Sequence, residues 1–552
     1  MIFIVPALGF SQSTSLPLQS KHQQLLERLS IMHPGDTGFN FSTAKPRTRK
    51  EYALGIAKLD SLAEAGDPLA GRLSKVDRYM MKNYLMNNSE WFEGDKSSFQ
   101  SKRPVFKTFY QTRSDFFQVN EKDFFLSVNP VIQQVQSKES DNDQRLFLNS
   151  KGARLRGLIA KKIGFDFYLT DNQERVPGFV QSFEKQFTAV PGAGFYKPFK
   201  TTAYDYFDAR GSVYFNVTKY INLQFGYDKN FLGNGYRSLY LSDFSNNYLF
   251  FKINTKIWKL NYQNIFMELS AKNLRDNSLV PKKYAAMHHL DLQVTRWLNI
   301  GLFESVIFGR QNKFEFSYLN PIIFLRSIEQ QNGSPDNAMV GFDFKATVAK
   351  RLQFYGQWML DEFVLKEVKA GNGWWGNKFG VQLGGKYIDA FSVKNLDLQG
   401  ELNFVRPFMY SKEDSVANYS HYNQPLAHPL GANFQEAVGI VRYQPAPKWQ
   451  IQGKLIVFRQ GLDTSARSYG GNIFKLNTSR VGEYGYKIGS GARATGINGS
   501  LWVGYEVLEN LFIDASVMVR DLDVPARQQL NQKSTLLSIG LRMNMARREY
   551  DY

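Results

Sequence analysis

Apolar and polar residues alternate along most of this chain, from about Lys102 nearly to its end. In the stretch FDARGSVYFNVT, the odd positions from Ala209 to Val217 are apolar or small, and the residues between them are mostly polar. Successive side chains of a β-strand point to opposite faces, so this period of two predicts strands with one apolar and one polar face. The same alternation recurs at 221–227, 342–348, 352–360, 396–404, 449–457 and 511–517.

The connections between these stretches are of two kinds. Short ones reverse the chain within a few residues, as in VTKYINL, VTRWLNI, VAKRLQF and APKWQIQ, whereas 411–433 and 461–498 are long and rich in Gly, Asn and Ser. Short turns at one rim and long loops at the other are typical of an outer-membrane β-barrel. Four aromatic residues beside the short turns predict an inner aromatic girdle: Tyr220, Trp258, Trp297 and Trp449.

The fold class that we expect is therefore all-β, a large transmembrane antiparallel β-barrel over residues 102–546. At roughly 25 to 30 residues per strand with its loop, this length gives about 14 to 18 strands. A soluble β-sandwich or propeller also buries one face of each strand. However, the polar face carries Asp, Arg, Lys, Gln and Asn almost without interruption, which favours a wide hydrated lumen. The last strand would be LLSIGLRMNM, followed by a polar tail from Ala546 to Tyr552.

Residues 20–92 follow a helical period and predict a small periplasmic α-helical domain. The segment KHQQLLERLSIM runs to the stop signal Pro34-Gly35, and a second helix begins near Thr48, where Thr48 and Glu51 have the spacing of a capping box. A third helix after Pro68 would place five apolar residues on one face: Leu69, Leu73, Val76, Met80 and Tyr84.

Composition supports export to a membrane without transmembrane helices. The mean hydropathy is -0.37 although 15% of the residues are aromatic, and no apolar run reaches the 18 residues of a membrane-spanning helix. The opening MIFIVPALGFSQ predicts that residues 1–12 are the remnant of a signal peptide, with a buried N-terminal strand as the alternative. The absence of cysteine excludes disulfides and Cys-ligated metal sites.

The formal net charge of +18 indicates polyanionic partners. Acidic surface polysaccharide and the phosphates of outer-membrane lipid or lipopolysaccharide both fit this charge. Export makes nucleic acid the least favoured partner, and we expect none.

Two glycine-rich motifs carry the candidate binding residues. GNGWWG matches a dinucleotide fingerprint, but that motif needs a helix after it, and here the strand-like NKFGVQLGGKYI follows. We therefore interpret it as a loop that displays Trp374 and Trp375, which could stack on sugar rings or belong to an interfacial girdle. GNGYRS lacks the P-loop lysine and is interpreted as a turn that brings Tyr236 and Arg237 to a rim or into the lumen.

No motif indicates catalysis, a metal or a cofactor. The six histidines lack the spacing that zinc hydrolases use, and there is no G-x-S-x-G nucleophile elbow. Asp361 and Glu362 are neighbours on a strand and face opposite sides, so they cannot act as a glycosidase pair. We expect a protein that is not an enzyme, with a lipase or deacylase inside the barrel as the alternative.

Long stretches of the chain resemble the Bacteroidota branch of the capsule-assembly Wzi family, which includes gliding-motility proteins of the RemB type. The resemblance rests on GYDKNFLGNGYRSLYLSDFSNNYLFFKI, YLNPIIFLRSIEQQNGSPDNAMVGFDFKA, the region that begins LDEFVLKEVKAGNGWWGNKFG, and HYNQPLAHPLGANFQEAVGIVRYQP. It implies an outer-membrane barrel of a Gram-negative bacterium, with a helical domain packed at its periplasmic end, that helps to retain or organise exported polysaccharide at the cell surface.

From these observations we expect a role in capsule or exopolysaccharide assembly and attachment, with a link to gliding motility. The alternative is a diffusion channel or a subunit of a motility or secretion complex. A plugged lumen would favour the first function, and a conducting pore the second.

Overall fold

The computed structural model describes residues 12–552 except 41, 69, 70, 141, 273–277, 323, 334 and 415. The predicted signal remnant, apart from Gln12, lies outside the described residues. Within the described chain, no helix combines the length and the apolar character needed to cross a membrane.

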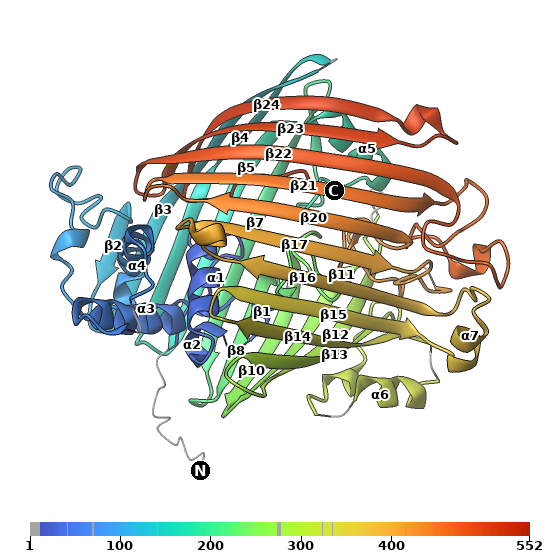
Figure 1. Cartoon of the computed structure of the whole chain (residues 1–552), viewed down its shortest axis with the longest axis horizontal. Coiled ribbons are helices and arrows are strands. Elements are labelled where there is room, and N and C mark those ends of the chain that lie inside the picture. The colour runs from blue at the N-terminus through green and yellow to red at the C-terminus, as the bar shows by residue number, and fades with distance from the viewer. Residues whose placement is uncertain are drawn as a thin grey trace.

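The described residues form a closed antiparallel barrel of 18 long strands, the upper end of the expected range (Figure 1). The first nine are β3 (Phe124–Glu139), β4 (Asn142–Ile159), β5 (Ile163–Arg175), β7 (Ala203–Asn216), β8 (Ile221–Asp228), β10 (Tyr248–Ile257), β11 (Leu260–Ser270), β12 (Lys282–Gln293) and β13 (Leu298–Phe308). The other nine are β14 (Asn337–Val348), β15 (Leu352–Glu362), β16 (Lys378–Tyr387), β17 (Leu396–Val405), β20 (Phe434–Tyr443), β21 (Trp449–Leu462), β22 (Ala492–Leu508), β23 (Leu511–Asp523) and β24 (Gln532–Met543). Short strands β2 (Phe117–Asn120) and β6 (Lys197–Phe199) pair with β3 and β7.

The ring closes between its first and last strands, β3 and β24. Their register runs from Leu536 opposite Glu139 to Met543 opposite Ile132. Closure leaves no free sheet edge, which is the condition for a sheet to cross a hydrocarbon layer.

The predicted alternation is confirmed, with the apolar face outside. On β7, Val213 is 45% exposed whereas its neighbour Tyr214 is 3% exposed. On β24, Leu537, Ile539 and Leu541 are all exposed, as expected for the last strand. A wall of exposed aliphatic and aromatic side chains around a polar interior is the pattern of a barrel solvated by lipid.

The two ends of the barrel differ as the sequence predicts. Tight turns follow β7, β10, β12, β14 and β20, and the aromatic residues beside them are exposed, most of all Trp258 at 76%. Long connections gather at the opposite end, which we call the external end (Figure 1). They carry α5 (Gly178–Phe187), α6 (Leu325–Gln331), α7 (Leu365–Ala370), and the small hairpin of β18 (Ser420–His421) and β19 (Gln424–Pro425).

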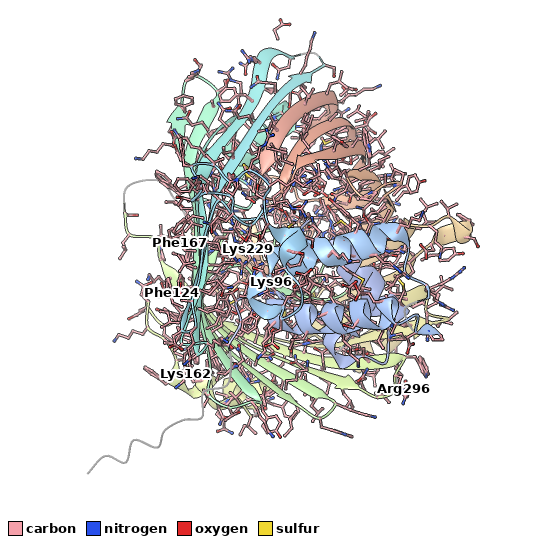
Figure 2. All side chains as sticks on the ribbon, turned by 90° about the vertical axis from the view of Figure 1, so that its left-hand side faces the viewer. Lys96, Phe124, Lys162, Phe167, Lys229 and Arg296 are labelled. Carbon is pink, nitrogen blue, oxygen red and sulfur yellow. The ribbon has the colours of Figure 1, made fainter. Side chains whose placement is uncertain are left out.

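Helices near the N-terminus lie across the mouth of the barrel at the short-turn end (Figure 2). They are α1 (Gln23–Met32), α2 (Thr37–Asn40), α3 (Arg49–Glu64) and α4 (Lys75–Asn87). Leu73, Val76, Met80 and Tyr84 of the predicted apolar face are buried, and Leu69 lies outside the described residues. We call these helices the plug.

The predicted capping box at Thr48 is wrong. Thr48 precedes α3, but its side chain makes no capping hydrogen bond, and Glu51 instead pairs with Lys256 on the barrel at 3.0 Å. The box is found at α4, where Ser74 accepts from the Asp77 amide and the Asp77 side chain accepts from the Ser74 amide. Spacing alone could not show that the barrel competes for the Glu51 carboxylate.

Arg28 joins the plug to the barrel wall. Its guanidinium makes a bidentate contact with Asp77 at 2.9 and 3.1 Å, and reaches Asp389 at 2.9 Å and Asp397 at 2.5 Å. Burial by itself would lower the pKa of Arg28, but the three carboxylates raise it, so the residue stays charged. Since Asp77 belongs to the plug and the other two acids to the end of the barrel, this cation links the two parts directly.

Replacing Arg28 with Met should release the plug. Three buried carboxylates would lose their shared cation, and breaking a buried ion pair costs about 3–5 kcal/mol. Hydrogen exchange in α1 and α4 measures the loss of protection, whereas the barrel strands should stay protected. Arg28→Lys keeps the charge but loses the bidentate contact, so its hydrogen-exchange rates in α1 and α4 should lie between those of the wild type and Arg28→Met. Unchanged exchange in Arg28→Met would contradict this role of Arg28.

Acid should also loosen the plug, through His22. This side chain is buried against Tyr84 and contacts Asn83 at 2.8 Å, and burial lowers its pKa to about 3 from the ordinary 6.5. Because the folded state favours the neutral ring, its stabilisation is complete above pH 6.5 and is lost as the pH falls from 6.5 toward 3. Protease protection of α1 should therefore fall over this range, and less steeply in His22→Gln; equal pH dependence in both proteins would refute this role.

Candidate functional site: the filled lumen and an external loop platform

The long connection between β8 and β10, residues 229–247, folds into the lumen instead of projecting outward. Leu239, Tyr240 and Leu241 are fully buried there. Within this connection, strand β9 (Phe231–Leu232) pairs with strand β1 (Ala44–Lys45) of the plug region. The connection is therefore continuous with the plug.

A second connection, residues 406–433, covers the first from the external side. The hydroxyl of Tyr410 donates to the carbonyl of Leu239 at 2.8 Å, and that of Tyr419 donates to the carbonyl of Tyr240 at 2.6 Å. Both tyrosines belong to one buried apolar cluster with side chains from the barrel wall, including Met287 and Met339. Where the sequence predicts a wide hydrated lumen, these two connections therefore occupy part of it with apolar side chains and with buried polar ones.

Tyr236 and Arg237 lie inside the lumen, one of the two positions that the sequence left open. The C-terminal tail turns back into the barrel and brings Asp551 to both residues. Arg237 approaches the Asp551 carboxylate at 3.4 Å and donates to its carbonyl at 2.6 Å, while the Tyr236 hydroxyl hydrogen bonds to the carboxylate. Lys454 contacts Tyr236 at 2.7 Å and pairs with Asp551 and Glu549.

These contacts show that Tyr236 and Arg237 are engaged inside the protein. Burial would raise the pKa of Glu549, but Lys454 and Arg547 lower it to about 2, so the tail remains anionic. Burial raises the pKa of Tyr236, which therefore remains a neutral hydrogen-bond donor. The chain's own tail occupies the position that an acidic ligand would take.

Trp374 and Trp375 lie at the external end, between α7 and β16. Backbone hydrogen bonds join residues 371–376 to residues 481–486: Gly485 donates to Asn372 and Tyr486 to Gly373, both at 2.9 Å. A Cβ at Gly373 would lie 2.8 Å from the Tyr486 backbone, and its φ is +70°, so glycine is required here. The strand after the motif confirms that GNGWWG is a turn and not a dinucleotide site. We call these two segments the loop platform.

The loop platform combines aromatic rings with cations. Trp375 is buried between Phe408 and Tyr486, donates its indole N–H to Glu483 at 2.7 Å, and carries Arg480 at 4.3 Å over its ring. Hydrogen bonds from Arg480 and Trp375 lower the pKa of Glu483. Trp374 is half-buried, and Tyr484 on the same platform is 56% exposed.

The structure thus separates the four predicted residues into two places. Trp374 can offer a ring face to an external ligand, whereas Trp375 is the ring that holds the platform together. Arg480, Glu483 and Tyr484 were missed because their role depends on loops more than a hundred residues apart. The only sequence signal for them was the cluster of tyrosines and glycines in the long connection at 461–498.

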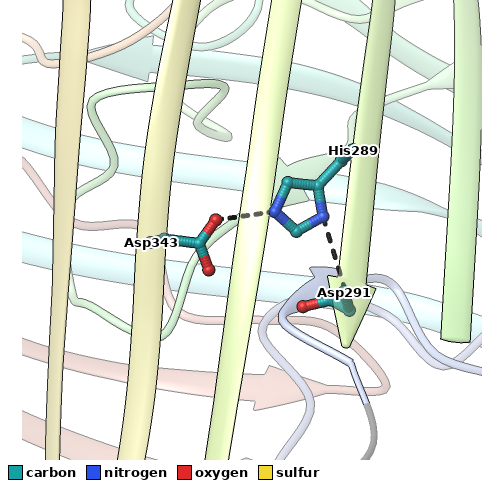
Figure 3. Close-up of side chains that lie close together, drawn as sticks. All are labelled: His289, Asp291 and Asp343. Atoms are coloured by element: carbon teal, nitrogen blue, oxygen red, sulfur yellow. Dashed lines mark hydrogen bonds and ion pairs between the residues drawn. The ribbon is translucent and has the colours of Figure 1, made fainter. Parts of the chain in front are cut away.

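A third cluster, His289, Asp291 and Asp343, faces the lumen from β12 and β14 (Figure 3). His289 Nε2 lies 2.8 Å from Asp343 and Nδ1 lies 3.4 Å from Asp291, so the ring bridges two carboxylates. Ser42 and Thr43 of the plug region donate to Asp291. Among the described residues, these three groups have donor atoms close enough to hold a metal ion, within 4.8 Å of one another. In the arrangement observed, they anchor the plug region to the wall.

A search for helical histidine motifs could not find this cluster. His289 and Asp291 share a face because they are two residues apart on a strand, and Asp343 comes from β14, two strands along the sheet. No i, i+4 spacing is involved.

The sequence matches no family model and no curated protein. Among solved structures, the fold is similar to Wzi, an outer membrane protein involved in group 1 capsule assembly in Escherichia coli that is described as a carbohydrate-binding β-barrel. The TM-score is 0.57 at 13% identity, over 97% of this chain and 100% of that one.

Two other solved barrels are less similar. OprD of Pseudomonas aeruginosa has a TM-score of 0.42 at 11% identity, over 75% of this chain and 94% of that one. OccAB2 of Acinetobacter baumannii has a TM-score of 0.42 at 11% identity, over 76% and 97%. Similarity at this level does not bear on function. The exposed apolar wall, the closed barrel and the similarity to the Wzi fold together identify an outer-membrane β-barrel.

Proposed function

We propose that this protein binds surface polysaccharide at its external end and takes part in the assembly or attachment of a capsule or exopolysaccharide. The observation that carries the proposal is the loop platform, an aromatic and cationic surface presented by a barrel whose lumen is filled. Because connections of the chain occupy the lumen, we expect the protein to work at its surfaces.

The chemistry of the loop platform favours an acidic glycan. The faces of Trp374 and Tyr484 offer flat apolar surface for sugar rings, and nearby Arg480 can attract a carboxylate. The net charge of +18 supports an anionic partner. The Wzi protein of similar fold is itself described as carbohydrate-binding and as involved in capsule assembly.

The resemblance to the Bacteroidota branch extends the proposal to motility. Gliding needs surface polymers that stay attached to the cell, so loss of an attachment protein would also reduce colony spreading. This link has no structural counterpart in the described residues and depends on the resemblance alone.

Deletion of the gene should release polysaccharide into the medium at unchanged total synthesis. Complementation with Trp374→Ala should restore attachment only in part, because one aromatic contact contributes about 0.5–1.5 kcal/mol, or roughly a 2- to 10-fold change in binding. Trp258→Ala, which alters an exposed indole at the opposite end, is the matched control. Normal attachment combined with lost spreading would reject the attachment role and assign the protein to the motility apparatus.

The filled lumen also separates this function from a diffusion channel. Purified protein in planar bilayers should show no steady ionic conductance, because the plug and the segments 229–247 and 406–433 block the path. A porin of known conductance in the same membrane controls for insertion. A stable open state of the wild-type protein would support the channel alternative.

A further inference from the structure

An open groove lies on the outer wall of the barrel, where the sheet closes on itself. Its apolar lining comes from three consecutive strands: Leu501 and Val503 of β22, Ala515 and Val517 of β23, and Leu537 and Ile539 of β24. Because it lies on the apolar wall, the molecule that fills it must have a hydrocarbon part.

The groove ends at an abrupt change in polarity between β24 and β3. Paired residues of neighbouring strands share a face, and here the register sets outward apolar residues against outward polar ones: Leu537 opposite Lys138, Ile539 opposite Gln136, and Leu541 opposite Gln134. Some outward pairs elsewhere in the barrel match in polarity. Between β14 and β15, for example, Phe342 lies opposite Trp358 and Ala346 opposite Phe354. The seam is therefore amphipathic across the wall, with its apolar side on β24 and its polar side on β3.

Two cations stand on the polar side of the groove, toward the external end. Lys138 of β3 and Arg145 of β4 are both exposed, and both line the groove. Arg145 donates to Gln136 at 2.6 Å, which directs its guanidinium along the seam. Within the part of the chain that the structure describes, neither cation lies within 4.0 Å of a carboxylate. Lys138 and the remaining N–H groups of Arg145 can therefore bind an anion from outside.

We propose that this seam binds one outer-leaflet lipid with a phosphate-bearing head. Its acyl chains lie against β22, β23 and β24, and its phosphate lies between Lys138 and Arg145. The apolar lining supplies the hydrophobic contact, and the cations select the head. Two cations near a membrane surface together raise the affinity for an anionic head by roughly thirtyfold.

A lipid fits this seam better than a second copy of the chain. None of the described residues that line the groove is acidic. A twofold interface through this face would therefore bring its cations onto apolar side chains or onto each other, with no carboxylate to pair them. A phosphorylated lipid satisfies both halves of the surface.

The test uses the full-length protein in nanodiscs of phosphatidylethanolamine with a minor share of phosphatidylglycerol. Native mass spectrometry counts the phosphatidylglycerol molecules retained after gentle removal of the disc. The wild-type protein should retain one, and Lys138→Gln with Arg145→Gln should lower its occupancy by about tenfold or more. Ala515→Trp, which fills the groove and leaves both cations, should displace the lipid as well.

Matched controls alter the same chemistry elsewhere. Lys366→Gln with Lys369→Gln removes two cations from exposed α7, and Ala346→Trp adds an indole to the outward face of β14; both proteins should retain the lipid like the wild type. Retention that is equal in the Lys138/Arg145 variant and the wild type would overturn recognition of the head. Retention unchanged by Ala515→Trp would overturn the groove as the site, and a dimer that dissociates in that variant would assign the face to a second copy.

Discussion

Hydrogen bonding of the backbone in a medium without water is the constraint on which the rest of this structure depends. A strand edge in hydrocarbon would leave its amides and carbonyls unpaired, so the sheet has to close, and it does so between β3 and β24. Closure by 18 strands creates a lumen too wide for the wall's own side chains to fill. The plug, the two folded-in connections and the returning tail are the consequences of that width.

Those inserted segments are held mainly by charge and hydrogen bonds, because the inner face of the wall is polar. Arg28 serves three carboxylates, His289 lies between two, and Lys454 takes both acids of the tail. Buried ion pairs cost desolvation and add little net stability, but losing one partner is expensive. They therefore fix the position of each inserted segment more than they strengthen the barrel, and the apolar cluster around Tyr240 supplies the packing.

The wall could be predicted from the sequence, whereas the contents of the lumen could not. Alternation is a local property, so Val213 and Tyr214 reveal their faces without knowledge of any other strand. The contact of Asp551 with Arg237 joins residues 314 positions apart and leaves no periodic trace. For the same reason, the sequence could show that Trp374 and Trp375 lie together in a loop, but it could not show that Trp375 is buried against Tyr486. The capping box failed similarly, because Glu51 was taken by a lysine on the wall.

The position of the positive charge limits what the net value of +18 can explain. Lys283 is fully buried and donates to the Asn418 carbonyl at 2.7 Å and the Ser420 hydroxyl at 3.1 Å, and Lys252 donates to Asn230 at 2.9 Å. Such lysines bind neutral oxygens of the inserted connections and cannot attract a polymer outside. The electrostatic case for an acidic glycan therefore depends on cations at the surface, such as Arg480 on the loop platform. A polyanion that recognises this protein should respond to the loss of those side chains and not to the overall charge.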